Sequence, residues 1–150
     1  MPRSRRRYCP MHSSTLFDPR MATVHAFLVE DNPLIRANVC ATLAELVGVE
    51  TLGWAADEPT ARTWLAAHTD WDLAIIDMFL EKGNGLGVLE ALSQRGEHQY
   101  AVVLTNYATA DIRARCERLG ADAVFDKSHE IDQLLSFCEQ LATGSPPRHD

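Results

Sequence analysis

Five polar residues follow apolar segments of the chain, and their side chains suit the chemistry of a cation and an anion. Glu30 and Asp31 come directly after the apolar run VHAFLV, and Asp77 ends the run DLAIID. Thr105 closes the run YAVVLT, and Lys127 comes two residues after AVF. Three carboxylates gathered in one place would repel each other unless a cation lay among them. A hard divalent ion with oxygen ligands meets that need, and Mg²⁺ is the expected ion.

These residues can meet only if the apolar runs are strands of one sheet. Runs rich in strand formers alternate with helical patterns, and strands are predicted at 24–29, 49–55, 72–77, 100–105 and 123–125. Strands that are apolar on both faces and separated by helices pair in parallel, with helices on both sides. The sequence therefore predicts an α/β fold with a doubly wound five-stranded parallel sheet, (βα)5, whose strand ends carry the polar residues. The second strand offers no such polar group.

Caps and breakers mark the helix boundaries. Asn32 followed by Pro33 opens a helix after the first strand, and Gly48 ends it. Ser128 is expected to cap the last helix. The helical periodicity predicts that the first helix buries four apolar side chains, those of Ile35, Val39, Leu43 and Leu46.

The segment GNGLG, residues 83–87, follows Asp77 closely and is rich in glycine. It lacks the lysine of a P-loop and the spacing of a dinucleotide-binding fingerprint. Its glycines are therefore expected to let the loop turn back into a helix rather than to bind phosphate.

The order of the five polar residues on five strand–helix units resembles the receiver domain of bacterial two-component response regulators, from residue 24 to residue 141. The resemblance implies the flavodoxin-like strand order 2-1-3-4-5. It also implies that Asp77 is the phosphoacceptor, which attacks a phosphohistidine on a partner histidine kinase and becomes an aspartyl phosphate. Lys127 would pair with one phosphoryl oxygen, and the Thr105 hydroxyl would move to donate a hydrogen bond to another.

The same resemblance implies a cofactor, Mg²⁺, with Mn²⁺ as an alternative. Asp31, Asp77 and the backbone carbonyl of Phe79 would hold the ion, and Glu30 would bind it through water. A receiver accepts a phosphoryl group and slowly loses it, so the protein is expected to be a signalling switch and not a metabolic enzyme.

Three features depart from the usual pattern of the family. Val124 stands where many receivers carry Tyr or Phe behind the moving threonine, which brings the usual aromatic gating into question. Asn106 follows Thr105 at a position where a small residue is common. Phe79 and Tyr107 would flank the phosphoryl group with large rings. Because bulk there obstructs the attacking water, we predict a long-lived phosphorylated form.

Two other interpretations of these residues stay open. A receiver-like module could bind partners without being phosphorylated, and Val124 favours that interpretation mildly. A small phosphatase could use Asp77 as the nucleophile against phosphate esters, although such enzymes usually place a second acid where Phe79 stands. Asp77 taken singly could also be a strand-ending residue or a helix cap, but the joint pattern favours the phosphoacceptor.

The length and the charge distribution limit the possible domain organisation of the chain. With 150 residues, 46% of them hydrophobic, the chain has room for one domain. We expect a basic disordered extension at 1–21, a receiver domain at 22–141 and a flexible tail at 142–150. Residues 1–20 hold five arginines against one aspartate, so within a total of −7 the remainder carries −11. That acidic body argues against nucleic acid as the main partner.

The expected partners are a sensor histidine kinase or phosphotransfer protein and a downstream protein of unknown identity. No apolar run reaches the roughly 20 residues of a membrane helix, so a cytoplasmic protein without membrane contact is expected. No segment with a core follows the fifth helix, so we expect a stand-alone receiver without a DNA-binding domain, acting through protein contacts or in a phosphorelay. Four cysteines show no metal-binding spacing, and three of them fall on apolar helical positions where a small buried thiol is expected; the four are Cys9, Cys40, Cys116 and Cys138.

Overall fold

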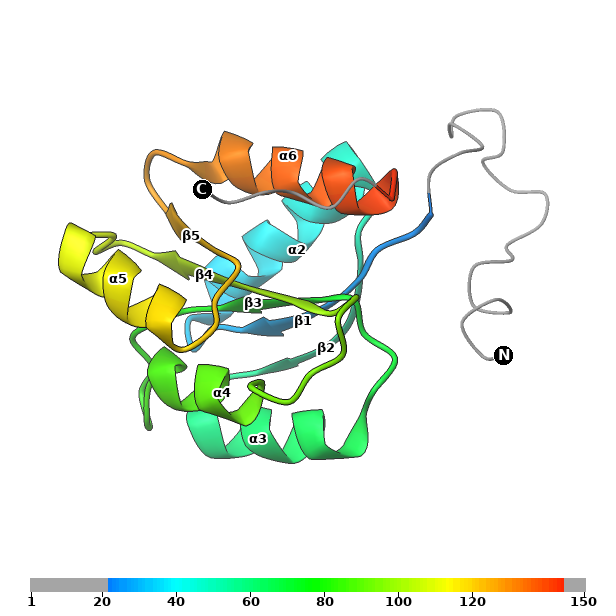
Figure 1. Cartoon of the computed structure of the whole chain (residues 1–150). Coiled ribbons are helices and arrows are strands. Elements are labelled where there is room, and N and C mark those ends of the chain that lie inside the picture. The colour runs from blue at the N-terminus through cyan, green and yellow to red at the C-terminus, as the bar shows by residue number, and fades with distance from the viewer. Residues whose placement is uncertain (1–21, 145–150) are drawn as a thin grey trace.

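The computed structural model describes residues 22–144, which contain a five-stranded sheet (Figure 1). The strands are β1 (His25–Val29), β2 (Glu50–Ala55), β3 (Leu73–Ile76), β4 (Tyr100–Thr105) and β5 (Ala123–Asp126). Their order is β2-β1-β3-β4-β5, and each neighbouring pair is parallel. The predicted doubly wound α/β fold with strand order 2-1-3-4-5 is confirmed.

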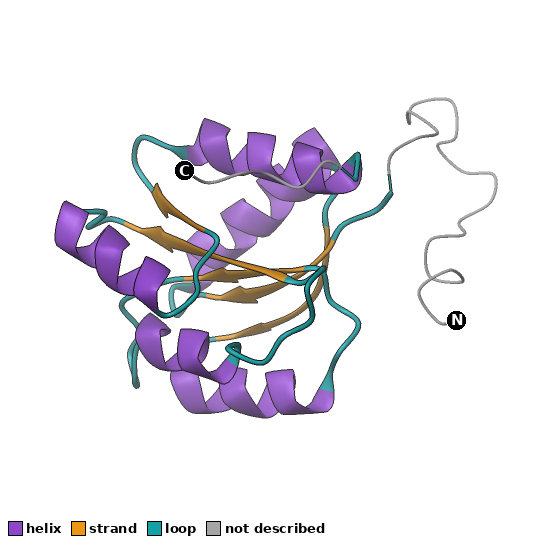
Figure 2. Ribbon diagram, in the orientation of Figure 1, coloured by secondary structure: helices purple, strands orange, loops and turns teal. Residues whose placement is uncertain are grey.

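Each strand of the described region is followed by a helix, and the helices cover both faces of the sheet (Figures 1 and 2). They are α2 (Pro33–Val47), α3 (Glu58–Ala67), α4 (Gly85–Ala91), α5 (Ala110–Arg118) and α6 (Ile131–Ala142). Helices α2 and α6 lie on one face, and α3, α4 and α5 lie on the other. This layering is what strands that are apolar on both sides require.

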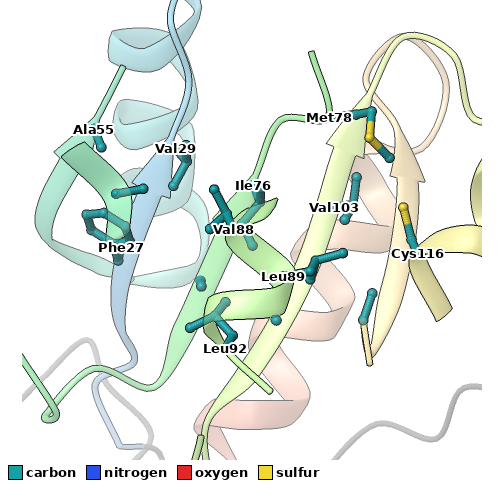
Figure 3. Close-up of a cluster of buried hydrophobic side chains, with 14 of the residues drawn as sticks. Phe27, Val29, Ala55, Ile76, Met78, Val88, Leu89, Leu92, Val103 and Cys116 are labelled. Atoms are coloured by element: carbon teal, nitrogen blue, oxygen red, sulfur yellow. The ribbon is translucent and has the colours of Figure 1, made fainter. Parts of the chain in front are cut away.

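Two apolar clusters, one on each face of the sheet, hold the layers together. The cluster under α3, α4 and α5 includes Phe27, Ile76 and Leu89, all fully buried (Figure 3). The cluster under α2 and α6 includes Leu28 and Leu134. Because successive residues of a strand point to opposite faces, Phe27 and Leu28 serve different clusters from one strand. The central strands are therefore fixed from both sides, and so are the loops at their ends.

Side-chain caps begin four of the helices. Asn32, Asp57, Asn84 and Thr109 each accept a hydrogen bond from a backbone N–H in the first turn of the helix that follows. Gly48 ends α2 with a left-handed φ of 67°, as predicted. The prediction that Ser128 caps the last helix is wrong. Glu130 precedes α6 without a capping hydrogen bond, and the Ser128 N–H instead donates to Asp126 Oδ1 at 2.7 Å.

The predicted buried face of the first helix is only partly correct. Leu43 is buried, and Ile35 and Val39 are half-buried, but Leu46 is 62% exposed. At about 100° per residue, Leu46 lies about 60° around the helix from Leu43, outside the border of the buried face. Val47 packs against the cluster in its place.

The predicted basic extension at 1–21, with Cys9, lies outside the described residues, as does 145–150 of the predicted tail. Of the other three cysteines, Cys116 and Cys138 are buried and Cys40 is half-buried. Among the described helices, none has the length and apolar character needed to cross a membrane.

Candidate functional site

Three carboxylates meet where β1 and β3 end. These strands are direct neighbours, with Val29 paired to Ile76, and the Asp77 N–H donates to the Val29 carbonyl at 2.9 Å. Glu30, Asp31 and Asp77 each offer an oxygen atom within 4.8 Å of those of the other two. An all-oxygen carboxylate set of this kind fits a hard divalent cation such as Mg²⁺.

Lys127 reaches the same cluster from the end of β5, the edge strand on the other side of β4. Its Nζ lies 2.7 Å from Glu30 Oε1 and 3.2 Å from Asp77 Oδ2. Glu30 is 3% exposed and Asp77 is 7% exposed, so their charges need the ammonium as a partner. The Lys127 N–H also donates to the Thr105 carbonyl at 2.9 Å, which fixes the start of the loop after β5.

Burial and neighbouring charges set the ionisation of the site. Burial raises the pKa of Asp77 to about 6, although the Lys127 ammonium lowers it, and the Glu30 carboxylate raises it further. For Lys127, burial disfavours the ammonium, but the hydrogen bond to Glu30 and the charge of Asp77 prevail and raise its pKa above the ordinary value. Asp77 is therefore mostly a carboxylate at pH 7, and Lys127 stays charged.

Thr105 is fully buried at the end of β4. Its Oγ1 accepts a hydrogen bond from the Tyr107 N–H at 3.2 Å, so its hydroxyl is tied to the loop between β4 and α5. Asn106 is exposed in that loop. The structure thus brings Glu30, Asp31, Asp77 and Lys127 into one cluster and sets Thr105 at the end of the next strand.

Two aromatic rings stand at the rim of the site. Phe79 is 51% exposed and Tyr107 is 63% exposed, and their ring centroids lie 5.4 Å apart in an edge-to-face arrangement. The Phe79 N–H donates to Asp77 Oδ1 at 3.4 Å, so the backbone of Phe79 lies beside the carboxylate. That these two rings flank a phosphoryl group on Asp77 stays a prediction.

Val124 is buried in β5, and an arginine that the sequence analysis missed binds its backbone. Arg113 of α5 donates to the Val124 carbonyl at 2.7 Å, to the Ala108 carbonyl at 3.1 Å and to Glu130 Oε1 at 2.8 Å. One guanidinium therefore joins the loop after Thr105, the strand β5 and the start of α6. No spacing along the sequence marks this contact, because its partners are brought together only by the fold.

As expected, the described residues of β2 add no polar group to the carboxylate cluster, but the helix after β2 contacts the loop that follows Asp77. Glu58 begins α3 after β2, and its Oε1 accepts from the Asn84 N–H at 3.1 Å in the loop after Asp77. The signals available in the sequence were Arg62, four residues further along the helix, and the glycines of the facing loop.

Comparison with known proteins agrees with this geometry. The sequence-family model of the response regulator receiver domain matches residues 26–139. The nitrate/nitrite response regulator protein NarP of Escherichia coli K12 is 30% identical over 128 residues, which cover 85% of this chain and 59% of that protein. The photosynthetic apparatus regulatory protein RegA of Rhodobacter capsulatus is 32% identical over 74 residues, 49% of this chain and 40% of that protein. The matched segments thus span 59% of the length of NarP and 40% of the length of RegA.

Solved structures share the fold. A two-component response regulator of the LuxR family from Aurantimonas sp. SI85-9A1 superposes with a TM-score of 0.72 at 20% identity, covering 83% of this chain and 88% of that one. The response regulator domain of Thermotoga maritima CheB gives a TM-score of 0.70 at 18% identity, covering 83% and 99%. With the family match over most of its length, the chain belongs to the response regulator receiver domain family, whose members act in two-component signal transduction.

Proposed function

We propose that the protein is a phosphoacceptor switch in which Asp77 receives a phosphoryl group from a histidine kinase or phosphotransfer protein. The observation that carries the proposal is the environment of Asp77. It is a buried carboxylate at a strand end, paired with Lys127 and grouped with two further carboxylates. A purely structural aspartate would not need such a costly arrangement of buried charges.

In the proposed reaction, an Asp77 carboxylate oxygen attacks the phosphorus of a phosphohistidine. A P–O bond to Asp77 forms as the P–N bond breaks, and the electron pair of that bond passes to the imidazole nitrogen of the donor. Asp77 must be ionised to attack, and its pKa of about 6 meets this condition at neutral pH. Lys127 lies within reach to neutralise a phosphoryl oxygen in place of the carboxylate that it now pairs with.

The carboxylates would hold Mg²⁺, or Mn²⁺ in its place, through Asp31, Asp77 and the Phe79 carbonyl, with Glu30 bound through water. When bound, such an ion neutralises charge that develops on the transferring phosphoryl oxygens. Asp31 and Asp77 supply the oxygen atoms, and Glu30 keeps a second carboxylate next to Lys127. The grouping of the three carboxylates supports this assignment.

Thr105 would convert phosphorylation into a conformational change. Its hydroxyl now accepts a hydrogen bond from the Tyr107 N–H, and turning to a phosphoryl oxygen would release the loop after β4. Asn106 and Tyr107 move with that loop, and Arg113 links it to β5 and α6 at Val124 and Glu130. We propose that the output is a change in protein contacts at these elements, or onward transfer of the phosphoryl group in a phosphorelay.

Intact mass spectrometry tests the proposal. The protein is incubated with a small phosphodonor such as acetyl phosphate, with and without Mg²⁺, and compared with Asp77→Ala and Asp77→Asn. A single phosphoryl adduct that needs Mg²⁺ and is absent from both variants is the expected result. A folded wild-type protein that forms no adduct with several donors would point to a module that works without phosphorylation.

A further inference from the structure

The first turn of α3 forms hydrogen bonds with the loop between β3 and α4, residues 77–84. The Glu58 N–H donates to the Lys82 carbonyl at 3.0 Å, and Glu58 Oε1 accepts from the Asn84 N–H at 3.1 Å. The backbone N–H of Glu58 and its side-chain carboxylate therefore both bind the loop backbone. These are contacts between segments that lie more than 20 residues apart in the sequence.

Arg62 holds the Glu58 carboxylate in this position. Its Nε donates to Glu58 Oε2 at 2.9 Å, one helical turn away on the same face of α3. Its second guanidinium nitrogen donates to the Gly87 carbonyl at 2.8 Å in α4. Glu58 thus holds the loop at Asn84, and Arg62 holds the following helix at Gly87.

Two glycines make room for the Glu58 side chain. A Cβ atom added at Gly83 or at Gly87 would overlap the Glu58 side chain, and Gly83 also has a φ of 78°, which other residues rarely adopt. The Glu58 side chain therefore fits into space that only glycine leaves open at positions 83 and 87. This fit explains Gly87, which the turn alone does not require because it lies inside α4.

Short backbone contacts link Asn84, which Glu58 binds, to the residues next to Asp77. Asn84 forms an antiparallel bridge with Phe79, and the Gly85 N–H donates to the Met78 carbonyl at 2.8 Å. A Cβ at Gly85 would lie 2.6 Å from the Asp77 carbonyl, so the loop passes directly against the strand end. Fixing Asn84 therefore fixes the backbone of Phe79.

We propose that Glu58, held by Arg62, is a positioning residue that sets the Phe79 backbone for cation binding at the carboxylate cluster. The inference rests on the proposed function, in which the Phe79 carbonyl is one of the ligands. Glu58 does not touch the ion; it acts through Asn84 and the Phe79–Asn84 bridge. Without the Glu58 carboxylate, the backbone bond to the Lys82 carbonyl remains, but the Asn84 N–H loses its acceptor on α3 and the Phe79 carbonyl is held less firmly.

Calorimetric titration with Mg²⁺ and amide hydrogen exchange without metal test the role. Glu58→Ala is expected to weaken Mg²⁺ binding by about 10-fold or more, as is typical when groups that orient metal ligands are removed. Exchange at the Asn84 and Phe79 amides is expected to speed up in the same variant. Glu58→Gln keeps an acceptor for Asn84 but loses the ion pair with Arg62, so it should restore part of both properties.

Two control variants separate positioning from general destabilisation. Glu90→Ala removes another carboxylate that Arg62 approaches, at 3.6 Å, but it leaves the loop untouched and should bind Mg²⁺ as the wild type does. Leu134→Ala destabilises the opposite face of the sheet and should also leave Mg²⁺ affinity unchanged. If the wild type binds Mg²⁺ and Glu58→Ala binds it equally well, the positioning role is overturned alone. If the wild type binds no Mg²⁺, the metal site of the proposed function fails as well.

Discussion

Replacing Asp77 by Asn should stabilise the metal-free protein at neutral pH. The folded protein holds Asp77 with a pKa of about 6, raised by burial above the ordinary value of 3.8. Above pH 6 the carboxylate is charged in both states, but only the folded state holds that charge away from water. Asn has a similar shape and no charge, and Lys127 keeps Glu30 as a partner at 2.7 Å.

The size of the effect follows from the two pKa values. A difference of about 2 pH units corresponds to about 3 kcal/mol in the free energy of unfolding, at about 1.36 kcal/mol per unit. Between pH 3.8 and 6 the folded state binds more protons than the unfolded state, so wild-type stability falls as the pH rises through this window. The advantage of Asp77→Asn should therefore be full above pH 6 and should vanish below pH 3.8.

Urea unfolding of wild type and Asp77→Asn in EDTA, at pH 4, 5, 6 and 7, measures this difference. Glu45→Gln removes an exposed carboxylate from α2 and should change stability by less than about 0.5 kcal/mol at each pH. The reasoning is refuted if Asp77→Asn is no more stable than wild type at pH 7, or if its advantage does not shrink on acidification. Added Mg²⁺ should stabilise the wild type more than the variant, because Asn is a poorer ligand.

Three further predictions concern the two exposed rings, Lys127 and Arg113. Replacing Phe79 by Asn together with Tyr107 by Glu should shorten the lifetime of the phosphorylated form, because the rings obstruct water; an unchanged rate of phosphate loss in timed mass spectra would contradict this. Lys127→Met should raise the pKa of Asp77 above about 6 in a metal-free carboxyl NMR titration, since the ammonium now lowers it. Arg113→Ala should cost about 1 to 3 kcal/mol in urea unfolding through its lost hydrogen bonds, whereas exposed Arg115→Ala on the same helix should cost less than about 0.5.

The sequence by itself was sufficient to predict the order of strands and helices and the residues at the strand ends. Apolar runs, caps such as Asn32 and breakers such as Gly48 act within a few residues of themselves, so they can be interpreted locally. Buried parallel strands place their carboxyl ends at one edge, and this rule correctly brought Glu30, Asp77 and Lys127 together. Leu46 and Ser128 show the limit of local patterns, since the packing direction of a helix and its true cap depend on what lies beside it.

Only the tertiary structure decided how these groups affect one another. Lys127 and Glu30 are 97 residues apart, and their distance of 2.7 Å depends on every strand between β1 and β5 keeping its register. The raised pKa of Asp77 comes from burial by surrounding elements, which no single segment encodes. The hydrogen bonds between Glu58 and Asn84 and between Arg113 and the Val124 carbonyl likewise join segments that are distant in the sequence. Side-chain types are local properties, but desolvation and hydrogen-bond geometry belong to the folded chain as a whole.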